Sequence, residues 1–302
     1  MRRFLPRSIS PALLGLAAAA LLARPAAAQD LLAQARALAD RGRWDSAYVL
    51  IQRAAEAEPN RAEVHFWHGS IAGSRAGQVG GLGAFGMARE SKRGLARAVE
   101  LEPDNPRYLQ GLIGFLSQAP GIVGGDRDSA LVLAERLRRL DAVSGTFQMA
   151  DVLRRGNERE KTRADSLVDD YGRAHAADRA VQLSVAGYYA STQRVERALA
   201  IDEQLLARDP RDVVARFGVG RNLVVLQREP RRAIALLRVV AATPPPAAGQ
   251  PSFSPAAPWW RIGQAFLQLG MPDSARVYYL RALAISPVFP QAQASLDSLA
   301  RR

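Results

Sequence analysis

The sequence predicts an all-α protein, an α-solenoid built from helical hairpins that repeat along the chain. The clearest hairpin lies near the C-terminus, where Trp259, Ile262 and Phe266 recur at helical spacing and form one apolar stripe. Gly263 removes a side chain at the point where a second helix approaches closely. The same order of apolar, small and turn residues returns several times, so we expect about six to seven stacked hairpins.

The second helix of this hairpin follows a turn formed by Gly270, Pro272 and Asp273. It ends before Pro287, because proline cannot continue a helical hydrogen-bond ladder. Eight positions of the two helices alternate large with small side chains: Trp259, Ile262, Gly263, Phe266, Ala275, Tyr279, Ala282 and Pro287. Their order resembles the tetratricopeptide repeat (TPR) signature W-x2-L-G-x2-Y…A-x3-F…P. This resemblance implies antiparallel helix pairs and a function in binding other proteins or peptides.

Earlier hairpins repeat this register, as expected because one hairpin cannot bury both of its faces without stacked neighbours. Further hairpins begin near Arg179 and near Val213, and a helix over 289–300 is expected to cover the last apolar face. In the first hairpin the matching slots hold Ala35, Leu38, Gly42, Trp44, Ala47, Ile51, Ala54 and Pro59.

Two middle hairpins are longer than the simple period. The second contains a glycine-rich stretch over 73–86, roughly ten residues more than the ~34-residue repeat, which we interpret as an interhelical loop. The third contains Ala-Pro-Gly-Ile-Val-Gly-Gly-Asp over 119–126, in which Asp126 is the expected N-cap of the next helix. Together they resemble uncharacterised exported bacterial TPR proteins with a Pro-Gly-x-x-Gly-Gly-Asp insertion. A less regular hairpin with a short first helix is expected over 146–176.

The N-terminal residues 1–28 are typical of a cleaved secretory signal peptide. Arg2 and Arg3 precede an apolar run over 12–23, and Ala26-Ala27-Ala28 provides an A-x-A cleavage site. A membrane anchor is the competing interpretation, but the run is shorter than the ~20 residues that a spanning helix needs. The chain has no cysteine, which excludes a lipidated cysteine after the signal and a disulfide framework. We expect a periplasmic or secreted protein with no transmembrane segment after cleavage.

The chain is basic, with a formal net charge of +12, which falls to +8 without residues 1–28. The positive charge is almost all arginine and is interspersed with Asp and Glu, as on solvated helix faces. No nucleic-acid partner is expected from this pattern. Acidic proteins or an anionic membrane surface fit the charge better.

The sequence carries no set of residues that predicts catalysis, a cofactor or a metal. Gly81-x-Gly83-x-x-Gly86 matches the dinucleotide fingerprint only formally, because no βαβ pattern surrounds it. His65 and His68 lie one helical turn apart but lack a third metal ligand. With three histidines and no cysteine, no catalytic triad can be composed, so we expect a protein that is not an enzyme.

The resemblance to TPR proteins implies a concave groove lined by the first helix of each hairpin, onto which a peptide or partner helix docks. Arg221 and Asn222 could hold a carboxylate there, as TPR carboxylate clamps do with basic and amide groups, although the full clamp pattern is absent. Packing between helices is the alternative role. The register places these side chains in the groove: Phe66, Tyr108, Phe217, Arg221, Asn222, Trp260 and Gln264.

Four segments follow: a signal peptide over 1–28, repeats over 29–243, a proline-rich linker or loop over 244–258, and a last hairpin with its capping helix over 259–302. The predicted function is a non-catalytic protein-interaction scaffold of the cell envelope. Two alternatives remain open, a homo-oligomeric assembly factor and a small-ligand carrier that uses the glycine-rich insertions.

Overall fold

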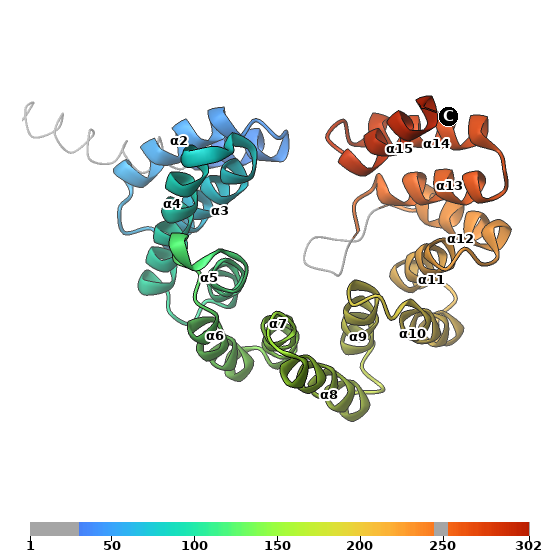
Figure 1. Ribbon diagram of the computed structural model, residues 1–302, viewed down its shortest axis with the longest axis horizontal. Helices are drawn as coiled ribbons and strands as arrows, with labels where there is room; N and C mark the ends of the chain where they lie inside the picture. The colour runs from blue at the N-terminus through green and yellow to red at the C-terminus, as the bar shows by residue number, and fades with distance from the viewer. Residues whose placement is uncertain (1–29, 245–252, 302) are drawn as a thin grey trace, which may run out of the picture. The chain divides into compact units, whose positions relative to one another are not determined.

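The computed structural model describes residues 30–244 and 253–301, and every regular element in these two ranges is a helix (Figure 1). The predicted signal peptide and most of the proline-rich segment lie outside the described residues. The chain forms two compact units whose boundary falls between Gly156 and Asn157. We call them unit 1 and unit 2.

Unit 1 consists of helical hairpins in which consecutive helices contact each other. A helix over 30–40 comes first. The elements that follow are α2 (Trp44–Ala57), α3 (Ala62–Val79), α4 (Gly81–Leu101), α5 (Pro106–Gln118), the short 3₁₀ helix η1 (Gly121–Val123), α6 (Arg127–Leu140) and α7 (Ala142–Arg154).

Unit 2 repeats the same arrangement. Its hairpins are α9–α10, α11–α12 and α13–α14, and the first helix of one hairpin also contacts the first helix of the next, α9 with α11 and α11 with α13. The elements are α8 (Glu158–Ala174), α9 (Arg179–Ser191), α10 (Val195–Arg208), α11 (Val213–Val225), α12 (Pro230–Ala242), α13 (Ala257–Gln268), α14 (Pro272–Ile285) and α15 (Pro290–Ala300).

Local sequence sets where many of these helices begin. Asp126 and Asp141 accept hydrogen bonds from the backbone N–H groups of Ser129 and Ser144, which satisfies donors that the first helical turn leaves free. The predicted N-cap role of Asp126 is therefore confirmed. Asn157 and Glu160 form a reciprocal capping box at the start of α8.

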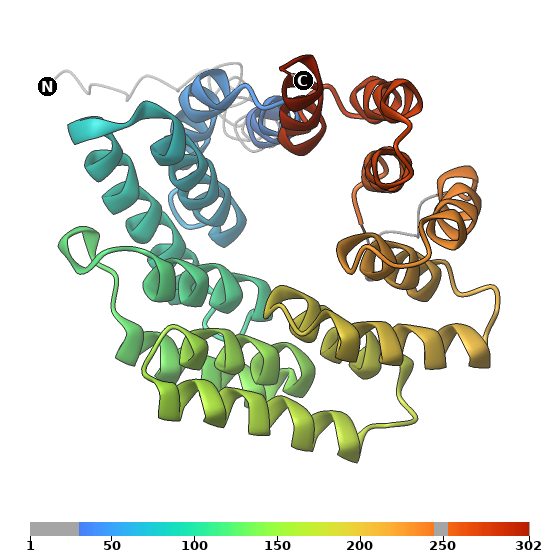
Figure 2. The same ribbon diagram turned by 45° about the vertical axis from the view of Figure 1, so that its right-hand side comes forward.

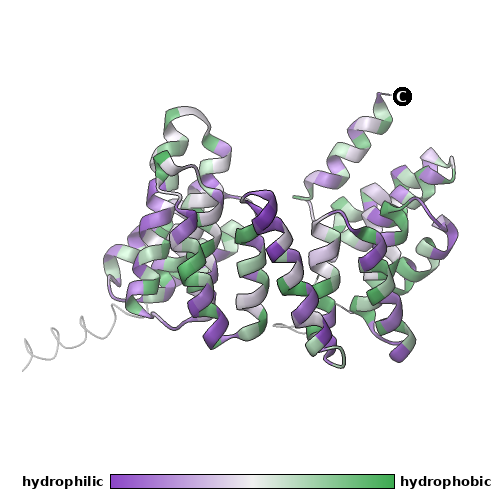
Figure 3. Ribbon diagram, turned by 60° about the horizontal axis from the view of Figure 1, so that its bottom comes forward, coloured by the Kyte–Doolittle hydropathy of each residue, from purple (hydrophilic) through white to green (hydrophobic). Residues whose placement is uncertain are grey.

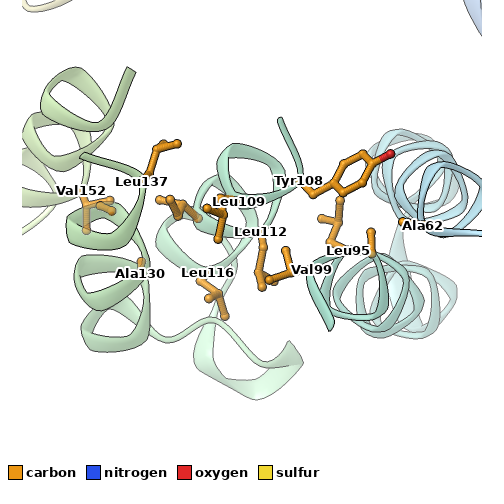
Figure 4. Packing of buried hydrophobic residues seen from close by; sticks show 13 residues of the cluster. Ala62, Leu95, Val99, Tyr108, Leu109, Leu112, Leu116, Ala130, Leu137 and Val152 are labelled. Carbon is orange, nitrogen blue, oxygen red and sulfur yellow. The ribbon is translucent and has the colours of Figure 1, made fainter. Parts of the chain in front are cut away.

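Apolar faces of adjacent helices pack into several hydrophobic clusters within each unit, and Figure 3 shows green and purple residues alternating around the helices. In unit 1 the side chains of α5 lie between α4 on one side and α6 and α7 on the other (Figure 4). The core residues at this junction include Leu95, Val99, Leu109, Leu112, Leu116, Leu137 and Val152. The corresponding core of unit 2 is built around Leu223, Leu237 and Ile262.

The structure corrects three expectations. Residues 73–79 and 81–86 are helical, so the glycine-rich stretch lengthens α3 and α4 and is not a loop; only Gly80, at φ 63°, departs from the helices. Helix α7 has 13 residues, as α9 and α11 have, and is not short. The last two residues of the proline-rich segment, Ala257 and Pro258, belong to α13, because proline is compatible with a first helical turn.

Candidate partner-binding site

Two pockets open along α9, α11 and α13 of unit 2, the surface that we call the A-helix face. A pocket of about 200 Å³ lies between α9 and α11 and is lined by Ser184, Phe217 and Arg221, among others. A pocket of about 830 Å³ lies between α11, α13 and α15 and is lined by Trp260, Arg261 and neutral polar residues. Both pockets therefore place an arginine next to an aromatic side chain.

Asp202 of α10 is a buried carboxyl group at the base of the smaller pocket, with 2 % of its surface exposed. Asn222 Nδ2 donates a hydrogen bond of 2.9 Å to its Oδ2 atom. A Cβ atom at Gly218 would lie 2.2 Å from the same oxygen, so the glycine makes room for the carboxyl group. Burial raises the pKa of Asp202 to about 7, against the opposing effects of Arg221 and of the Asn222 hydrogen bond.

Arg221 of α11 and Arg261 of α13 are partly buried cations that lie close enough to affect each other's charge. Burial lowers the pKa of Arg221, and the negative charge of Asp202 only partly offsets this effect. Burial also lowers the pKa of Arg261 to about 10, and the positive charge of Arg221 lowers it further. The two guanidinium groups therefore destabilise each other in a partly desolvated position.

The hydrogen-bond partners of both arginines are neutral amides. Arg221 Nε donates to Asn222 Oδ1 at 3.1 Å, and Arg261 Nη1 donates to Gln264 Oε1 at 2.8 Å. The Arg261 guanidinium also lies over the Trp260 ring, 4.2 Å from its centroid. Neither arginine forms an ion pair with a carboxylate of the described part of the chain. An anion bound between them would relieve their repulsion, and guanidinium groups match a carboxylate in geometry.

The remainder of the larger pocket is rich in uncharged polar groups. Such side chains both donate and accept hydrogen bonds, so they can pair with the backbone of an extended peptide without selecting its sequence. They are Gln227, Gln264, Gln268, Gln291, Ser295 and Ser298.

The structure places four of the predicted groove residues on the A-helix face and buries a fifth. Arg221, Phe217, Trp260 and Gln264 line the two pockets, although Phe217 is only 8 % exposed and also belongs to the core of unit 2. Asn222 is only 1 % exposed, so it cannot contact a partner as predicted; its amide instead joins Asp202 to Arg221.

The aromatic residues of this face are held by neighbouring side chains. Phe217 stacks on Phe253 with ring centroids 4.1 Å apart, and Trp260 Nε1 donates to Ser295 Oγ at 3.0 Å. Trp260 also packs edge-on against Phe289. These contacts fix the walls of the pockets before any partner arrives.

The two predicted groove residues of unit 1 contact each other. The rings of Phe66 and Tyr108 lie 5.1 Å apart, and the Arg107 guanidinium covers Phe66 at 4.7 Å. Tyr108 is buried in the core of unit 1. Tyr108 therefore has the alternative role, packing between helices.

Unit 1 has a separate pocket of about 520 Å³, formed by α2, α3 and α4. Glu90 accepts a hydrogen bond from the Tyr48 hydroxyl and lies 3.6 Å from His68 Nε2. Burial lowers the pKa of His68 and, together with Glu90, raises that of Tyr48 to about 12. Within the described ranges no group of three or more His, Cys, Asp or Glu residues is placed to hold a metal ion.

Comparisons with solved structures identify the fold. No protein-family model and no curated protein matches the chain. A tetratricopeptide repeat protein from Parabacteroides merdae is 14 % identical, with a TM-score of 0.53 over 90 % of this chain and 98 % of its own. The chain has the fold of a TPR protein. Yeast Tom70 gives a TM-score of 0.61 at 13 % identity, over 84 % of this chain and 49 % of its own.

A third solved structure of similar fold contains a ligand. The human IFIT1 dimer with PPP-AAAA is 16 % identical, with a TM-score of 0.51 over 84 % of this chain and 58 % of its own. The present chain thus spans about half the length of Tom70 and IFIT1. Among the described residues, no helix is both long and apolar enough to cross a membrane.

Sequence reasoning missed Asp202 and Arg261. Asp202 gives a local signal, because it occupies an apolar position of its helix between Ala198 and Leu205, both of which are buried. Arg261 gives no such signal, since it follows Trp260 at a position for which the repeat pattern specifies no residue type. Its place near Arg221 depends on the stacking of α11 on α13.

Proposed function

We propose that this chain is a non-catalytic interaction scaffold of the cell envelope that binds a peptide or partner protein on the A-helix face of unit 2. A carboxylate of the partner binds between Arg221 and Arg261, and the amide-rich pocket takes the adjoining backbone. The observation that supports this proposal most directly is the pair of partly buried guanidinium groups, of which Arg221 interacts only at longer range with Asp202 and neither forms a direct ion pair among the described residues. The envelope location follows from the signal-peptide pattern over residues 1–28.

A peptide library tests the carboxylate site. Short peptides with free C-termini are compared with the same peptides carrying C-terminal amides, and binding is followed by fluorescence anisotropy. We expect the free acids to bind at least about tenfold more tightly, because a charge-assisted bidentate pair contributes about 1.5–3 kcal/mol. Arg261→Gln and Arg221→Gln should each remove this preference.

Arg238→Gln is the matched control, because Arg238 is an exposed arginine of α12 that contacts Tyr278 and lines neither pocket. It should leave binding unchanged. Equal binding of acids and amides, or unaltered binding by Arg261→Gln, would reject the site. Crosslinking the tagged chain in its own envelope fraction, with the same variants, then identifies the partner, while crosslinks only between copies of the chain would favour homo-oligomeric assembly.

A further inference from the structure

The end of the α3–α4 hairpin is an exposed, uncharged segment. Helices α3 and α4 have 18 and 21 residues, whereas their neighbours α2 and α5 have 14 and 13. No residue from 76 to 88 carries a charge. Leu82 is 89 % exposed, and Val79 and Phe85 are 48 % and 41 % exposed. A water-soluble surface rarely displays large apolar side chains grouped at a protruding tip.

Packing does not explain the composition of this tip. A Cβ atom at Gly77 or Gly86 would meet no other atom within 4 Å, so no neighbouring element requires glycine there. Each glycine in a helix interior is less favourable than alanine by about 1 kcal/mol. The tip is thus free of tertiary contacts at these positions and is only weakly held as a helix, which leaves it able to adapt to another surface.

The apolar residues share one side of α4 with two cations. Leu82, Phe85, Arg89 and Lys92 follow one another at intervals of three and four residues, which places them in one stripe. Arg89 and Lys92 form no ion pair within the described residues. The stripe therefore changes from apolar at the tip to positively charged toward the middle of the helix.

The second insertion reaches the same stripe. The 3₁₀ helix η1 contacts α4, and Gly124 lies so close to Lys92 that an added Cβ would be 2.7 Å from its Cδ atom. Next to this contact, Ile122 extends outward with 70 % of its surface exposed. In Figure 2 the end of the α3–α4 hairpin and the loop that carries η1 project from the same side of unit 1.

We infer that this face of unit 1, formed by Leu82, Phe85, Arg89, Lys92 and Ile122, docks onto an anionic lipid surface. The apolar side chains enter the interface between headgroups and acyl chains, while Arg89 and Lys92 pair with lipid phosphates. Apolar residues around cations on one helix face are the pattern by which helices lie on charged bilayers. This inference is independent of the carboxylate site in unit 2.

A second copy of the chain fits the same face less well. A symmetric contact would bring the Arg89 and Lys92 side chains of both copies together, and Asp126, the carboxylate near Lys92, would offset only part of this positive charge. Stable dimers also bury about 800 Å² on each partner, whereas the exposed apolar side chains of this face are few.

The absence of cysteine allows a direct test. Leu82→Cys introduces a unique thiol in the chain from Gln29 onward, which retains every described helix and lacks the apolar N-terminal run. The thiol is labelled with the environment-sensitive dye NBD. On addition of vesicles that contain phosphatidylglycerol, we expect a blue shift and a rise in emission, and pure phosphatidylcholine should give neither. Val277→Cys, at an exposed position of α14, is the matched label site and should show no change.

Unlabelled variants measure the contribution of each group by co-sedimentation with the same vesicles. Leu82→Asp with Phe85→Asp should lower the partition coefficient at least about tenfold, and Arg89→Glu with Lys92→Glu should lower it on the order of tenfold or more, with far-UV circular dichroism checking the fold. The inference is overturned if the dye at position 82 does not respond to anionic vesicles, or if it responds to protein concentration in their absence, which would indicate self-association.

Discussion

At the scale of single residues, Asp202 and Arg221 carry opposite charges, and burial disfavours the charged form of each. The pKa of Asp202 rises and that of Arg221 falls, so desolvation outweighs their mutual attraction at both ends of the pair. Asn222 partly compensates by donating to one group and accepting from the other. The Asp202–Arg221 pair therefore affects the site through the positions of its two charges and contributes little to the free energy of folding.

Asp202 should make the stability of unit 2 depend on pH. Its folded pKa of about 7 lies above the unfolded value of 3.8, so the folded state binds the proton more tightly. This contribution is complete below about pH 4 and is lost as the pH rises to about 7, on the order of 2–4 kcal/mol at most. Asp202→Asn should remove this decline from urea unfolding curves; an equal decline in the variant would contradict the assignment.

The same proton should control affinity for a carboxylate. Below about pH 7 Asp202 becomes neutral, so Arg221 and Arg261 act without an adjacent negative charge. Binding of peptides with free C-termini should therefore strengthen several-fold between about pH 8 and pH 6. In Asp202→Asn the affinity should stay at the higher level throughout this range, as anisotropy titrations would show.

At the scale of elements, close helix crossings depend on individual glycines. Gly69 and Gly94 lie where α3 crosses α4, and a Cβ atom at Gly94 would be 2.6 Å from the Gly69 backbone nitrogen. The obstacle is backbone, which cannot move aside as a side chain can. The two helices would have to separate to admit even a methyl group.

Gly94→Ala should therefore lower the free energy of unfolding of unit 1 by about 1–3 kcal/mol, because it overpacks the crossing. Gly77→Ala in the same hairpin should raise it by up to about 1 kcal/mol, since alanine favours a helix and nothing lies near its Cβ. Urea denaturation measures both. A loss of stability for Gly77→Ala would show that the tip makes contacts in solution.

The helices were largely predictable because their signals are local. Turn residues such as Gly270 and Pro272, and caps such as Asp126, act within a few residues of the chain. The stretch over 73–86 was not predictable in this way, because its many glycines favoured a loop, whereas only Gly80 and Gly81 have the positive φ angles of the turn. Arg221 was predicted from register, but the position of Asp202 beside Gly218, which sets the charge next to Arg221, is a relation between two helices that one sequence does not contain.

At the scale of the whole molecule, the division into two units has a measurable consequence. In repeat proteins each hairpin is stabilised only by its neighbours, so long arrays need not unfold in one step. The four tryptophans are divided equally, with Trp44 and Trp67 in unit 1 and Trp259 and Trp260 in unit 2. Fluorescence can therefore follow each unit separately.

We expect the variant with Trp44→Phe and Trp67→Phe, which reports on unit 2 alone, to unfold in urea at a midpoint different from that of the variant with Trp259→Phe and Trp260→Phe. Circular dichroism of the unaltered chain should span both transitions. Coincident curves from the three measurements would instead indicate one cooperative structure.

The capping box at Asn157 and Glu160 affects more than the start of α8. Because these two side chains satisfy the first donors of α8 from within unit 2, an extra segment inserted after Gly156 would expose no unpaired backbone group there. We therefore expect α8 to keep its first turn when a segment is inserted at this boundary. The boundary is also where a designer would lengthen the array or exchange one unit for another.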